Sequence, residues 1–423
     1  MTRAPLLRIK RVGRRVIRAA LIRYARAAPR PSELAGVERR VYLMLNTAWG
    51  MGGTIRAGLN LAGYLTEHGY DVQIVSVTRT RDKPFFAFPE GVEVVSLDDR
   101  RRRAEPPRGV HKLLSSLGSV LMHASDLAAG NFTLWTDIVL VRHLRRRAGF
   151  LITTRPGFNL IAAALKPPGL VTIGQEQMNL RSHVAPLRRA IVKGYDRLDV
   201  LAVLTDADMR TYSERLNGRL RLERIPNTVR DLGPATADLD AKTVITAGRL
   251  TRQKGYDLLI PAWSQVTAKH PDWRLRIFGS GESRGFLAGM IEEHGLADVV
   301  TLDGPARSLG EEMEAASVYV LSSRFEGLPL VLLEAMSKGM AVVSFDCPTG
   351  PGDVIDDHRN GILVPPRDVD ALAAGIVELI EDPELRRRCA AAAVETARRY
   401  TMEAVGPRWL ELLRGLHAER ARP

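Results

Sequence analysis

The sequence predicts an α/β protein with two Rossmann-like, parallel-sheet domains that face each other across a cleft, preceded by a basic amphipathic extension. Two observations lead to this prediction. Short apolar runs of strand length alternate with helix-forming stretches through most of the chain, as they do in successive βαβ units. The chain also has 423 residues, which is too long for one ordinary hydrophobic core, so two domains are expected.

We expect the chain to divide into three parts. Residues 1–39 form the basic amphipathic segment, residues 40–229 the first domain, and residues 230–400 the second domain. The start of the second part, up to Asp240, is rich in Asp, Pro, Ala and Gly, which is typical of a linker between domains. A final amphipathic helix at 401–420 is expected to pack back on the first domain.

Composition excludes several protein classes. The chain is 45% hydrophobic and 26% charged, which suits a soluble α/β protein. The two cysteines, Cys347 and Cys389, stand outside any ligand-like cluster, so neither a disulfide framework nor a zinc site is expected. This usage fits a reducing, cytoplasmic compartment. No run of 18 apolar residues exists that could cross a bilayer.

Positive charge is concentrated near the N-terminus. The net charge is +13, and residues 1–30 carry ten Lys or Arg and no acid. On a helical wheel one face collects the apolar residues Leu6, Ile9, Val12, Val16, Ile17, Ala20 and Tyr24. This pattern predicts a helix that lies in an anionic membrane surface, which would place the protein on the inner face of the plasma membrane. The alternatives are a flexible, solvated tail and a transit peptide, although the segment is poor in serine and lacks a secretory apolar core.

Two further basic clusters, at 100–103 and 142–147, indicate that the first half meets an anionic partner. Each cluster alone is usually a solvated face. A nucleic acid is not favoured as that partner, because aromatic residues do not interleave with the basic clusters as stacking on bases would require.

The first domain opens with a strand, a glycine-rich loop and a helix. Gly52 and Gly53 end this loop and allow backbone N–H groups to approach a phosphate or sugar, although their spacing is not that of a dinucleotide fingerprint. A polar loop at 174–179 follows a later strand and should line the same cleft. The expected strands are 41–45, 72–77 and 200–204, the expected helices are 54–68 and 205–215, further apolar runs are 138–141, 150–153 and 170–173, and residues 79–108 are polar and irregular.

The second domain is organised around the stretch 317–346, which reads as strand, helix and strand with short connections. Such a right-handed βαβ unit binds ligands beyond the carboxyl ends of its strands. Around it we expect strands at 243–247, 275–278, 299–302 and 362–364 and helices at 256–268, 286–294, 309–316, 371–399 (broken at Pro383) and 402–418.

Four charged residues fall at strand ends in this second half. Arg249 and Lys254 follow the first strand, and Glu326 and Glu334 flank the start of the helix in the central βαβ unit, with seven residues between them. Two cations and the free N–H groups of a helix start suit a diphosphate that gains negative charge as it leaves. Glu334 suits a diol such as ribose, and Glu326 another polyol. Taken singly, each could instead be a helix cap or a solvated surface charge.

With these motifs the second half resembles the family 4 retaining glycosyltransferases, which have the two-domain GT-B fold. The resemblance is strong over about 243–366 and loose over the first half. It rests on Gly248-Arg249-Leu250 with Lys254-Gly255, Phe278-Gly279-Ser280-Gly281, Arg324-Phe325-Glu326-Gly327-Leu328-Pro329 through Glu334-Ala335-Met336, and Gly361–Val364 with Pro365. The Cys-Pro-Thr-Gly-Pro run at 347–351 is similar to the form in bacterial members that build cell-wall or capsular polymers.

The resemblance implies roles for these positions. Arg249 and Lys254 match the pair on the donor diphosphate and, with Glu326 facing the transferred sugar, would be the catalytic groups. Glu334 matches the acid on the donor ribose. The remaining donor-binding positions are the backbone of Leu330 and Val331 at the distal phosphate, Gly53 in the first loop, and Gly279 and Gly304 after two strands.

One departure from the family pattern concerns the loop after the strand at 170–173. Relatives often have a histidine there that touches the sugar 6-hydroxyl, whereas this chain has Gln177, with His183 as a weaker, surface candidate. Gln can make that hydrogen bond but cannot act as an acid or base.

The resemblance implies a retaining transferase, needing no metal or other cofactor, that moves a hexose from a nucleotide sugar, a UDP-sugar, to a polymeric glycan or polyprenyl-linked acceptor. A protein that places Arg and Lys on the diphosphate can dispense with a metal. The alternatives are another GT-B-like sugar-nucleotide enzyme such as an epimerase, a phosphorylase, and a basic nucleic-acid-binding protein. The sugar, the acceptor linkage and the oligomeric state are not specified by the sequence.

Overall fold

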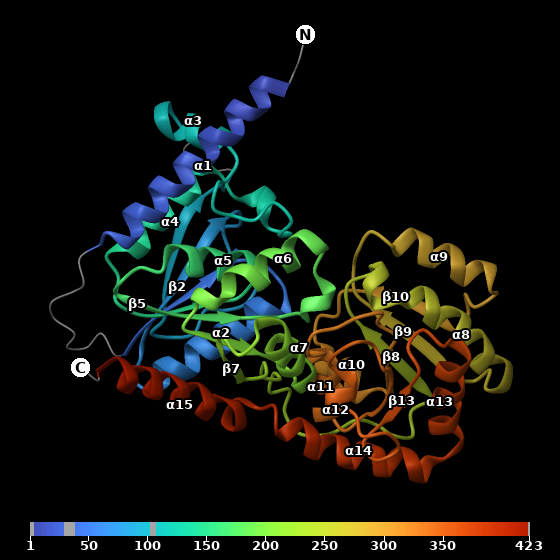
Figure 1. The fold of residues 1–423 in the computed structure, drawn as a ribbon. Helices are drawn as coiled ribbons and strands as arrows, with labels where there is room; N and C mark the ends of the chain where they lie inside the picture. The colour runs from blue at the N-terminus through green and yellow to red at the C-terminus, as the bar shows by residue number, and fades with distance from the viewer. Residues whose placement is uncertain (1–3, 29–38, 102–106, 422–423) are drawn as a thin grey trace. The chain divides into compact units, whose positions relative to one another are not determined.

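A computed structural model describes residues 4–28, 39–101 and 107–421, with side chains from residue 12 onward. The chain divides into two compact units (Figure 1). The first comprises Met1–Leu204, Asp208–Ile225 and Gly406–Pro423, and the second comprises Thr205–Ala207 and Pro226–Val405. Each unit has its own parallel sheet and its own hydrophobic core. The two-domain α/β fold expected from the sequence is therefore confirmed.

The first sheet has the strand order β3-β2-β1-β4-β5-β6-β7 in the described part of the chain, and neighbouring strands run parallel. Its central strands are buried on both faces and are almost wholly apolar, as expected for a sheet covered by helices. The strands are β1 (Arg40–Leu45), β2 (Asp71–Arg79), β3 (Glu93–Asp99), β4 (Gly149–Thr153), β5 (Leu170–Gln175), β6 (Val200–Val203) and β7 (Arg221–Arg224).

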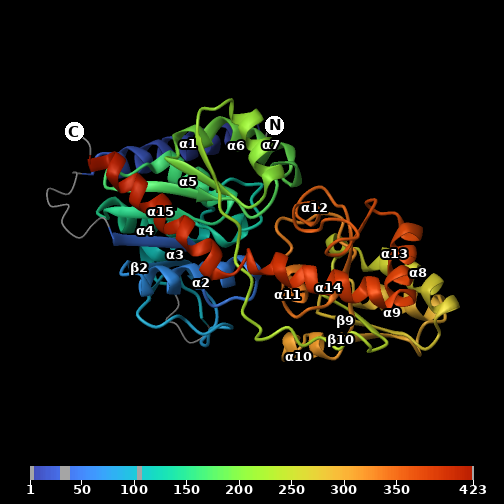
Figure 2. The ribbon, with the colours of Figure 1, turned by 90° about the horizontal axis from the view of Figure 1, so that it is seen from below.

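Helices cover both faces of this sheet, and residues from 406 onward of the last helix lie along the first unit (Figure 2). An added Cβ at Gly406 would meet the Tyr64 ring at 2.3 Å, which shows how closely this helix packs on α2. The helices are α1 (Ala4–Arg26), α2 (Gly53–Glu67), α3 (Gly109–Ser116), α4 (Leu134–Arg145), α5 (Pro156–Leu165), α6 (Ala185–Gly194), α7 (Asp206–Leu216) and α15 (Met402–Ala421), with 3-10 turns η2 (Ala129–Asn131), η3 (Leu180–Ser182) and η4 (Tyr195–Arg197).

The N-terminal helix α1 packs on α4 and α5 through the C-terminal half of its length (Figure 1). Ala25 is fully buried, and Leu21 and Ile22 pack against the first core. Over residues 12–28 the segment is therefore no solvated tail. The polar contacts agree: Arg14 donates to the carbonyls of Gly118 and Ser119, Arg26 to that of Ala164, and the Arg145 guanidinium lies 4.3 Å from the Tyr24 ring centroid.

The apolar face predicted for this helix is a different one, and it remains exposed. Val12, Val16, Ile17 and Tyr24 are all exposed, while Leu21 and Ile22, which lie outside the predicted face, are the residues that pack on the core. The predicted positions Leu6 and Ile9 lie outside the described side chains, as do residues 102 and 103 of the first basic cluster. Within the described residues, no helix combines the length and apolarity needed to cross a bilayer.

The second sheet has the order β10-β9-β8-β11-β12-β13 in the described residues, again with parallel neighbours. Its strands are β8 (Thr243–Ala247), β9 (Arg274–Phe278), β10 (Val300–Gly304), β11 (Val318–Leu321), β12 (Ala341–Phe345) and β13 (Ile362–Val364). Its helices are the short turn η5 (Arg252–Lys254), α8 (Tyr256–Lys269), α9 (Arg284–Glu293), α10 (Leu309–Glu314), α11 (Leu330–Ser337), α12 (Pro351–Val354), α13 (Val369–Glu381) and α14 (Pro383–Arg398).

Three parts of the first unit differ from the sequence-based expectation. The sheet was expected to close with the strand at 200–204, but the short, half-buried strand β7 pairs with β6 beyond it. The polar segment 79–108 contains β3, an edge strand whose side chains are mostly half-buried and so lack an apolar run. The apolar run Ile138–Val141 is not a strand but the middle of α4. Its neighbours Leu134 and Leu144 are buried on the same helix, so the relevant pattern is helical spacing over a longer window.

Acid should destabilise the first unit through His143 of α4. Its Nε2 lies 3.0 Å from Gln73 Oε1, and burial, reinforced by Arg147, lowers the His143 pKa to about 4. Between pH 6.5 and 4 the unfolded chain therefore binds a proton that the folded chain does not, so the free energy of unfolding falls as the pH falls through this window. The His143→Gln variant should lose this share of the pH dependence in urea denaturation. An unchanged pH profile in the variant would contradict the assignment.

Candidate functional site

Four loops meet at the carboxyl edge of the second sheet: 248–255, 279–281, 322–329 and 347–351. They follow β8, β9, β11 and β12, which are consecutive in the strand order. In a parallel sheet all strand ends of one kind meet at the same edge, so loops far apart in the sequence become neighbours. The sequence-predicted residues of the second half come from these loops and from the elements beside them.

The centre of this loop cluster is an ion pair between Lys254 and Glu326. Lys254 Nζ lies 2.7 Å from Glu326 Oε1, and the two side chains are only 16% and 9% exposed. Ser323 Oγ donates to the same carboxylate oxygen at 2.6 Å, and Thr349 Oγ1 donates to the Glu326 carbonyl. The structure thus brings together two of the three predicted catalytic residues and orients the Glu326 carboxylate through a second contact, from Ser323.

Glycines allow the loop backbones to approach this closely. A Cβ at Gly255 would lie 2.0 Å from the Ser322 carbonyl oxygen, one at Gly279 1.8 Å from the Gly248 oxygen, and one at Gly350 2.0 Å from the Gly327 oxygen. Real Cβ atoms cannot come so near an oxygen, and all three glycines also have positive φ angles. The loop cluster therefore depends on backbone-to-backbone contact.

A second ion pair ties the loops together beside the first. Both guanidinium Nη atoms of Arg324 donate to the Asp257 carboxylate at 2.6 and 2.7 Å. The Arg324 backbone N–H donates to the Gln253 carbonyl at 2.8 Å, and Gln253 Nε2 donates to the Phe325 carbonyl. Such bidentate Arg–carboxylate pairs hold geometry well, so Lys254 and Glu326 are presented on a rigid frame.

The other predicted donor-side residues lie around this frame. Arg249 follows β8 and has an exposed side chain. Leu330 and Val331 are the first residues of α11, and Glu334 is half-buried one turn further along the same helix. Gly279 and Gly304 end neighbouring strands β9 and β10, where the Gly279 N–H donates to the Gly304 carbonyl at 2.8 Å.

Cys347 in the fourth loop is no nucleophile at neutral pH. Burial raises the pKa of its thiol to about 12, and the nearby Glu326 and Asp346 carboxylates act in the same direction. A protonated, buried thiol is unreactive. Within the described residues, no group of three or more His, Cys, Asp or Glu side chains is arranged to hold a metal ion.

Gly53 and Gln177 belong to the first unit. Gly53 is exposed and is the first residue of α2, so the N–H groups of this helix start face outward beside the end of β1. Gln177 is half-buried in the loop after β5. Both therefore lie at the carboxyl edge of their own sheet.

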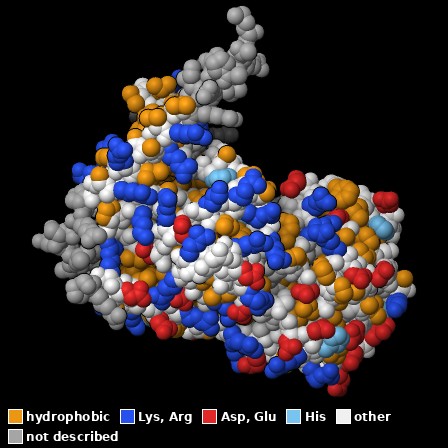
Figure 3. Space-filling view, in the orientation of Figure 1, with side chains coloured by type: hydrophobic (Ala, Val, Ile, Leu, Met, Phe, Trp, Pro, Cys, Tyr) orange, Lys and Arg blue, Asp and Glu red, His pale blue; other side chains and the backbone are white. Residues whose placement is uncertain are grey.

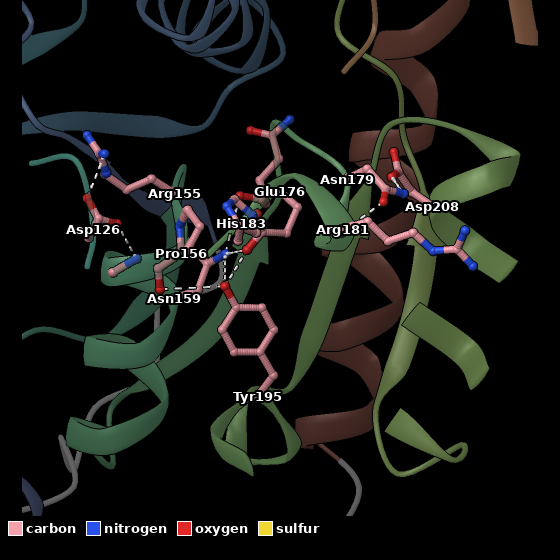
Figure 4. A network of polar contacts seen from close by, with 12 residues as sticks. Asp126, Arg155, Pro156, Asn159, Glu176, Asn179, Arg181, His183, Tyr195 and Asp208 are labelled. Carbon is pink, nitrogen blue, oxygen red and sulfur yellow. Dashed lines mark hydrogen bonds and ion pairs between the residues drawn. The ribbon is translucent and has the colours of Figure 1, made fainter. Parts of the chain in front are cut away.

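The loop that carries Gln177 is held by a buried carboxylate that the sequence analysis did not single out (Figure 4). Glu176 is 1% exposed, and its Oε1 accepts from the Tyr195 hydroxyl and, at 2.9 Å, from Asn159 Nδ2. Burial, and then the Glu176 charge, raise the pKa of Tyr195 well above its usual value, so the phenol remains a donor.

His183 faces the same carboxylate, so its prediction as a surface residue is wrong. Its side chain is 13% exposed and its Nε2 lies 3.5 Å from Glu176 Oε2 (Figure 4). Further along the loop Asn179 Nδ2 donates to Asp208 Oδ1 at 2.8 Å. Only the contrast between Glu176 and its apolar preceding strand could have signalled this network in the sequence.

Comparisons with known proteins give three findings. Residues 233–396 match the family model described as Glycosyl transferases group 1. An exopolysaccharide phosphotransferase of Streptomyces coelicolor is 34% identical over 387 residues, covering 89% of this chain but only 41% of that protein. An uncharacterized glycosyltransferase of Haemophilus influenzae is 27% identical over 367 residues, covering 86% of this chain and 96% of that protein.

Among solved structures, a mutant of S. aureus TarM in complex with fondaparinux, α-GlcNAc-glycerol and UDP superposes with a TM-score of 0.72 at 17% identity. The match covers 89% of this chain and 99% of the TarM chain. At this level of identity the likeness shows the fold alone, the two-domain GT-B fold expected from the sequence.

Replacing Gly255 should weaken the loop cluster. In Gly255→Ala the methyl group meets the Ser322 oxygen, and a left-handed conformation alone costs about 1–2 kcal/mol for an L-residue. We expect the free energy of unfolding of the second unit to fall by at least ~2 kcal/mol in urea denaturation. Gly289→Ala in α9 is the matched control: no atom lies within 4 Å of its added Cβ, so stability should hold or rise by about 1 kcal/mol. Equal stability of the two variants would argue against the packing described.

Proposed function

We propose that this chain, a GT-B glycosyltransferase with a group 1 domain at residues 233–396, is a retaining enzyme. It transfers a hexose from a nucleotide sugar to a polymeric or lipid-linked glycan. The observation that carries the proposal is the Lys254–Glu326 pair within the rigid loop cluster, with Arg249 exposed on the same loop as Lys254. A UDP-sugar is the proposed donor, because the structurally similar TarM was solved with UDP.

In this proposal Arg249 and Lys254 bind the donor diphosphate and stabilise the charge that develops as the sugar leaves. Preorganised cations do this best where water is excluded, and Lys254 is 84% buried by its own loops, being 16% exposed. The N–H groups of Leu330 and Val331 add the positive end of α11 at the distal phosphate. With two cations on the diphosphate, we expect no metal requirement.

Glu326 is proposed to face the transferred sugar and Glu334 the ribose hydroxyls. A carboxylate fixed by Lys254 and Ser323 keeps one oxygen engaged and can offer the other to sugar hydroxyls. The acceptor proton passes to the leaving phosphate oxygen on the same face of the sugar, so the C1–O bond to phosphate breaks as the bond to the acceptor oxygen forms. This needs no protein nucleophile, in keeping with the protonated thiol of Cys347.

We propose that the glycan acceptor binds to the first unit and that this unit lies against a membrane surface. The similar Streptomyces coelicolor protein is named for exopolysaccharide, which supports a polymeric glycan. Hydrophobic side chains and Lys or Arg side chains lie side by side at the end of the first unit where α1 and α3 are found (Figure 3). Val12 and Val16 of α1 and Val110 and Leu113 of α3 are 55–69% exposed there. Mixed apolar and basic surfaces of this kind bind anionic lipids, so we propose a peripheral position on the inner face of the plasma membrane.

Removing either diphosphate cation should slow transfer. We expect Arg249→Ala and Lys254→Ala each to raise the barrier by about 2–4 kcal/mol, or roughly 30-fold to 1,000-fold in rate, measured as sugar transfer and as UDP-sugar hydrolysis. Arg252→Ala, an exposed residue of the same loop, should stay within twofold. Undiminished rates in both cation variants would contradict the proposal.

Lys254→Ala also leaves the Glu326 carboxylate without its partner, so loss of folding must be separated from loss of catalysis. The double variant Lys254→Ala/Glu326→Gln removes the unpaired charge. We expect it to recover the melting temperature of the wild type more closely than the single variant does, without recovering the rate.

Membrane binding should depend on the exposed apolar face of α1. Deleting residues 1–30 would also remove the buried Ala25, so point changes are the cleaner test. Each valine buried in lipid is worth roughly 1.5 kcal/mol, so Val12→Asp/Val16→Asp should bind anionic vesicles at least ~10-fold more weakly in sedimentation. Phe286→Asp, at a residue 63% exposed in α9, is the control and should bind like the wild type. Equal sedimentation of all three proteins would remove the membrane proposal.

A further inference from the structure

A cavity of about 200 Å³ lies in the helix layer of the first unit, and no residue of the loop cluster described above lines it. Its lining comes from α1, from the loop before η2, from α5, from α6 and from the turn η4. The residues that matter for its chemistry are Arg18, His123, Lys193 and Arg197, with Leu121 and Leu160 on the apolar part of the wall.

Three cations converge on this cavity from three separate elements. Arg18 comes from α1, Lys193 from α6 and Arg197 from η4, and no carboxylate lines the cavity. Within the described part of the chain none of the three forms an ion pair, whereas the neighbouring Arg155 is paired with Asp126 at 2.6 Å. Three like charges around one small space repel each other, so an anion placed among them would be stabilised.

The wall of the cavity is fixed by carboxylates behind it. Asp137 accepts from Ser119 Oγ at 2.7 Å and from the N–H of Val120 at 2.6 Å, and Asp126 accepts from the N–H of Gly157 at 2.8 Å. The loop that carries Leu121 and His123 is thereby held at both of its ends. His123 is therefore held in place without the entropic cost of ordering its loop on binding, whereas the three cations are exposed side chains of α1, α6 and η4.

His123 adds a donor without adding charge. Burial lowers the pKa of its imidazole; Asp126 opposes this effect and Arg18 reinforces it. Its Nδ1 accepts a hydrogen bond from the Ser125 N–H at 3.2 Å, so in the neutral ring the proton sits on Nε2. The ring therefore offers an N–H group beside three cationic side chains.

The volume of the cavity and the mix of charged and apolar side chains on its wall suit a small anionic group that carries a carbon chain. The cavity is several times the roughly 30 Å³ that a water molecule occupies in the liquid and smaller than the ~300 Å³ at which drug-sized sites begin. A phosphate group fits within this volume. The apolar wall of Leu121 and Leu160 suits an alkyl or glyceryl chain beside that phosphate.

We propose that this cavity binds the phosphate group of a phosphate ester, with Arg18, Lys193 and Arg197 as its cationic ligands and His123 as a neutral donor. The ester is either the headgroup of an anionic amphiphile or a soluble phosphate compound. The assignment does not depend on the donor chemistry of the second unit, because every lining residue lies in the first.

The test is calorimetric titration of the full-length protein with dihexanoyl phosphatidic acid, with dihexanoyl phosphatidylcholine and sodium phosphate in parallel. Lys193→Glu/Arg197→Glu reverses two exposed charges of the cavity. Arg210→Glu/Arg215→Glu reverses two exposed charges of α7 and changes the net charge equally. We expect the cavity variant to bind the phosphatidic acid at least tenfold more weakly and the control variant to stay within twofold.

The comparison of probes assigns the source of the phosphate. Tighter binding of the phosphatidic acid than of sodium phosphate supports a lipid headgroup, and equal binding supports recognition of phosphate alone. The proposal is overturned if both variants lose the same amount of affinity for phosphatidic acid. It is also overturned if neither phosphatidic acid nor sodium phosphate shows saturable binding at millimolar concentration. UDP binding by the cavity variant should equal that of the wild type, so failure of the donor site would be seen separately.

Discussion

The buried ion pair between Lys254 and Glu326 is the interaction around which the second unit is arranged. Withdrawing two charges from water costs several kcal/mol per ion, and attraction offsets this cost only when the geometry is good and further hydrogen bonds are made. Ser323 supplies such a bond to the carboxylate, and Ser322 supplies one to the Lys254 carbonyl at 2.9 Å. Lys254 and Glu326 are 72 positions apart in the chain, and they meet because β8 and β11 are neighbours in the sheet.

The first unit uses buried carboxylates in a different way, as clamps on backbone and side chains. Glu176 joins Tyr195 to Asn159, while Asp126 and Asp137 hold the loop that precedes α4. Burial raises the pKa of Asp137 to about 6 even though its three donors act in the opposite direction. Loops at the carboxyl edge of a parallel sheet have no ladder hydrogen bonds of their own, so such clamps give them a defined position.

The two units differ in how well their helices and strands could be predicted from the sequence. In the second unit nearly every element was predicted, because its strands are short, apolar and separated by glycine or proline turns. In the first unit, β3 was missed because an edge strand that is half-exposed has no apolar run. The run Ile138–Val141 was misleading because four apolar residues fit one turn of a buried helix as well as a strand.

The sequence by itself determined the class of fold, the alternation of strands and helices, and the spacing of Arg249, Lys254 and Glu326, because these depend on local propensity and short-range pattern. Only the tertiary structure decided that Lys254 pairs with Glu326, that Glu176 is buried against Tyr195, and that α1 packs through Leu21 and Ile22. These facts depend on which strands become neighbours and which helix face meets the core. Both are set by the summed burial of the whole domain, which no local window of sequence contains.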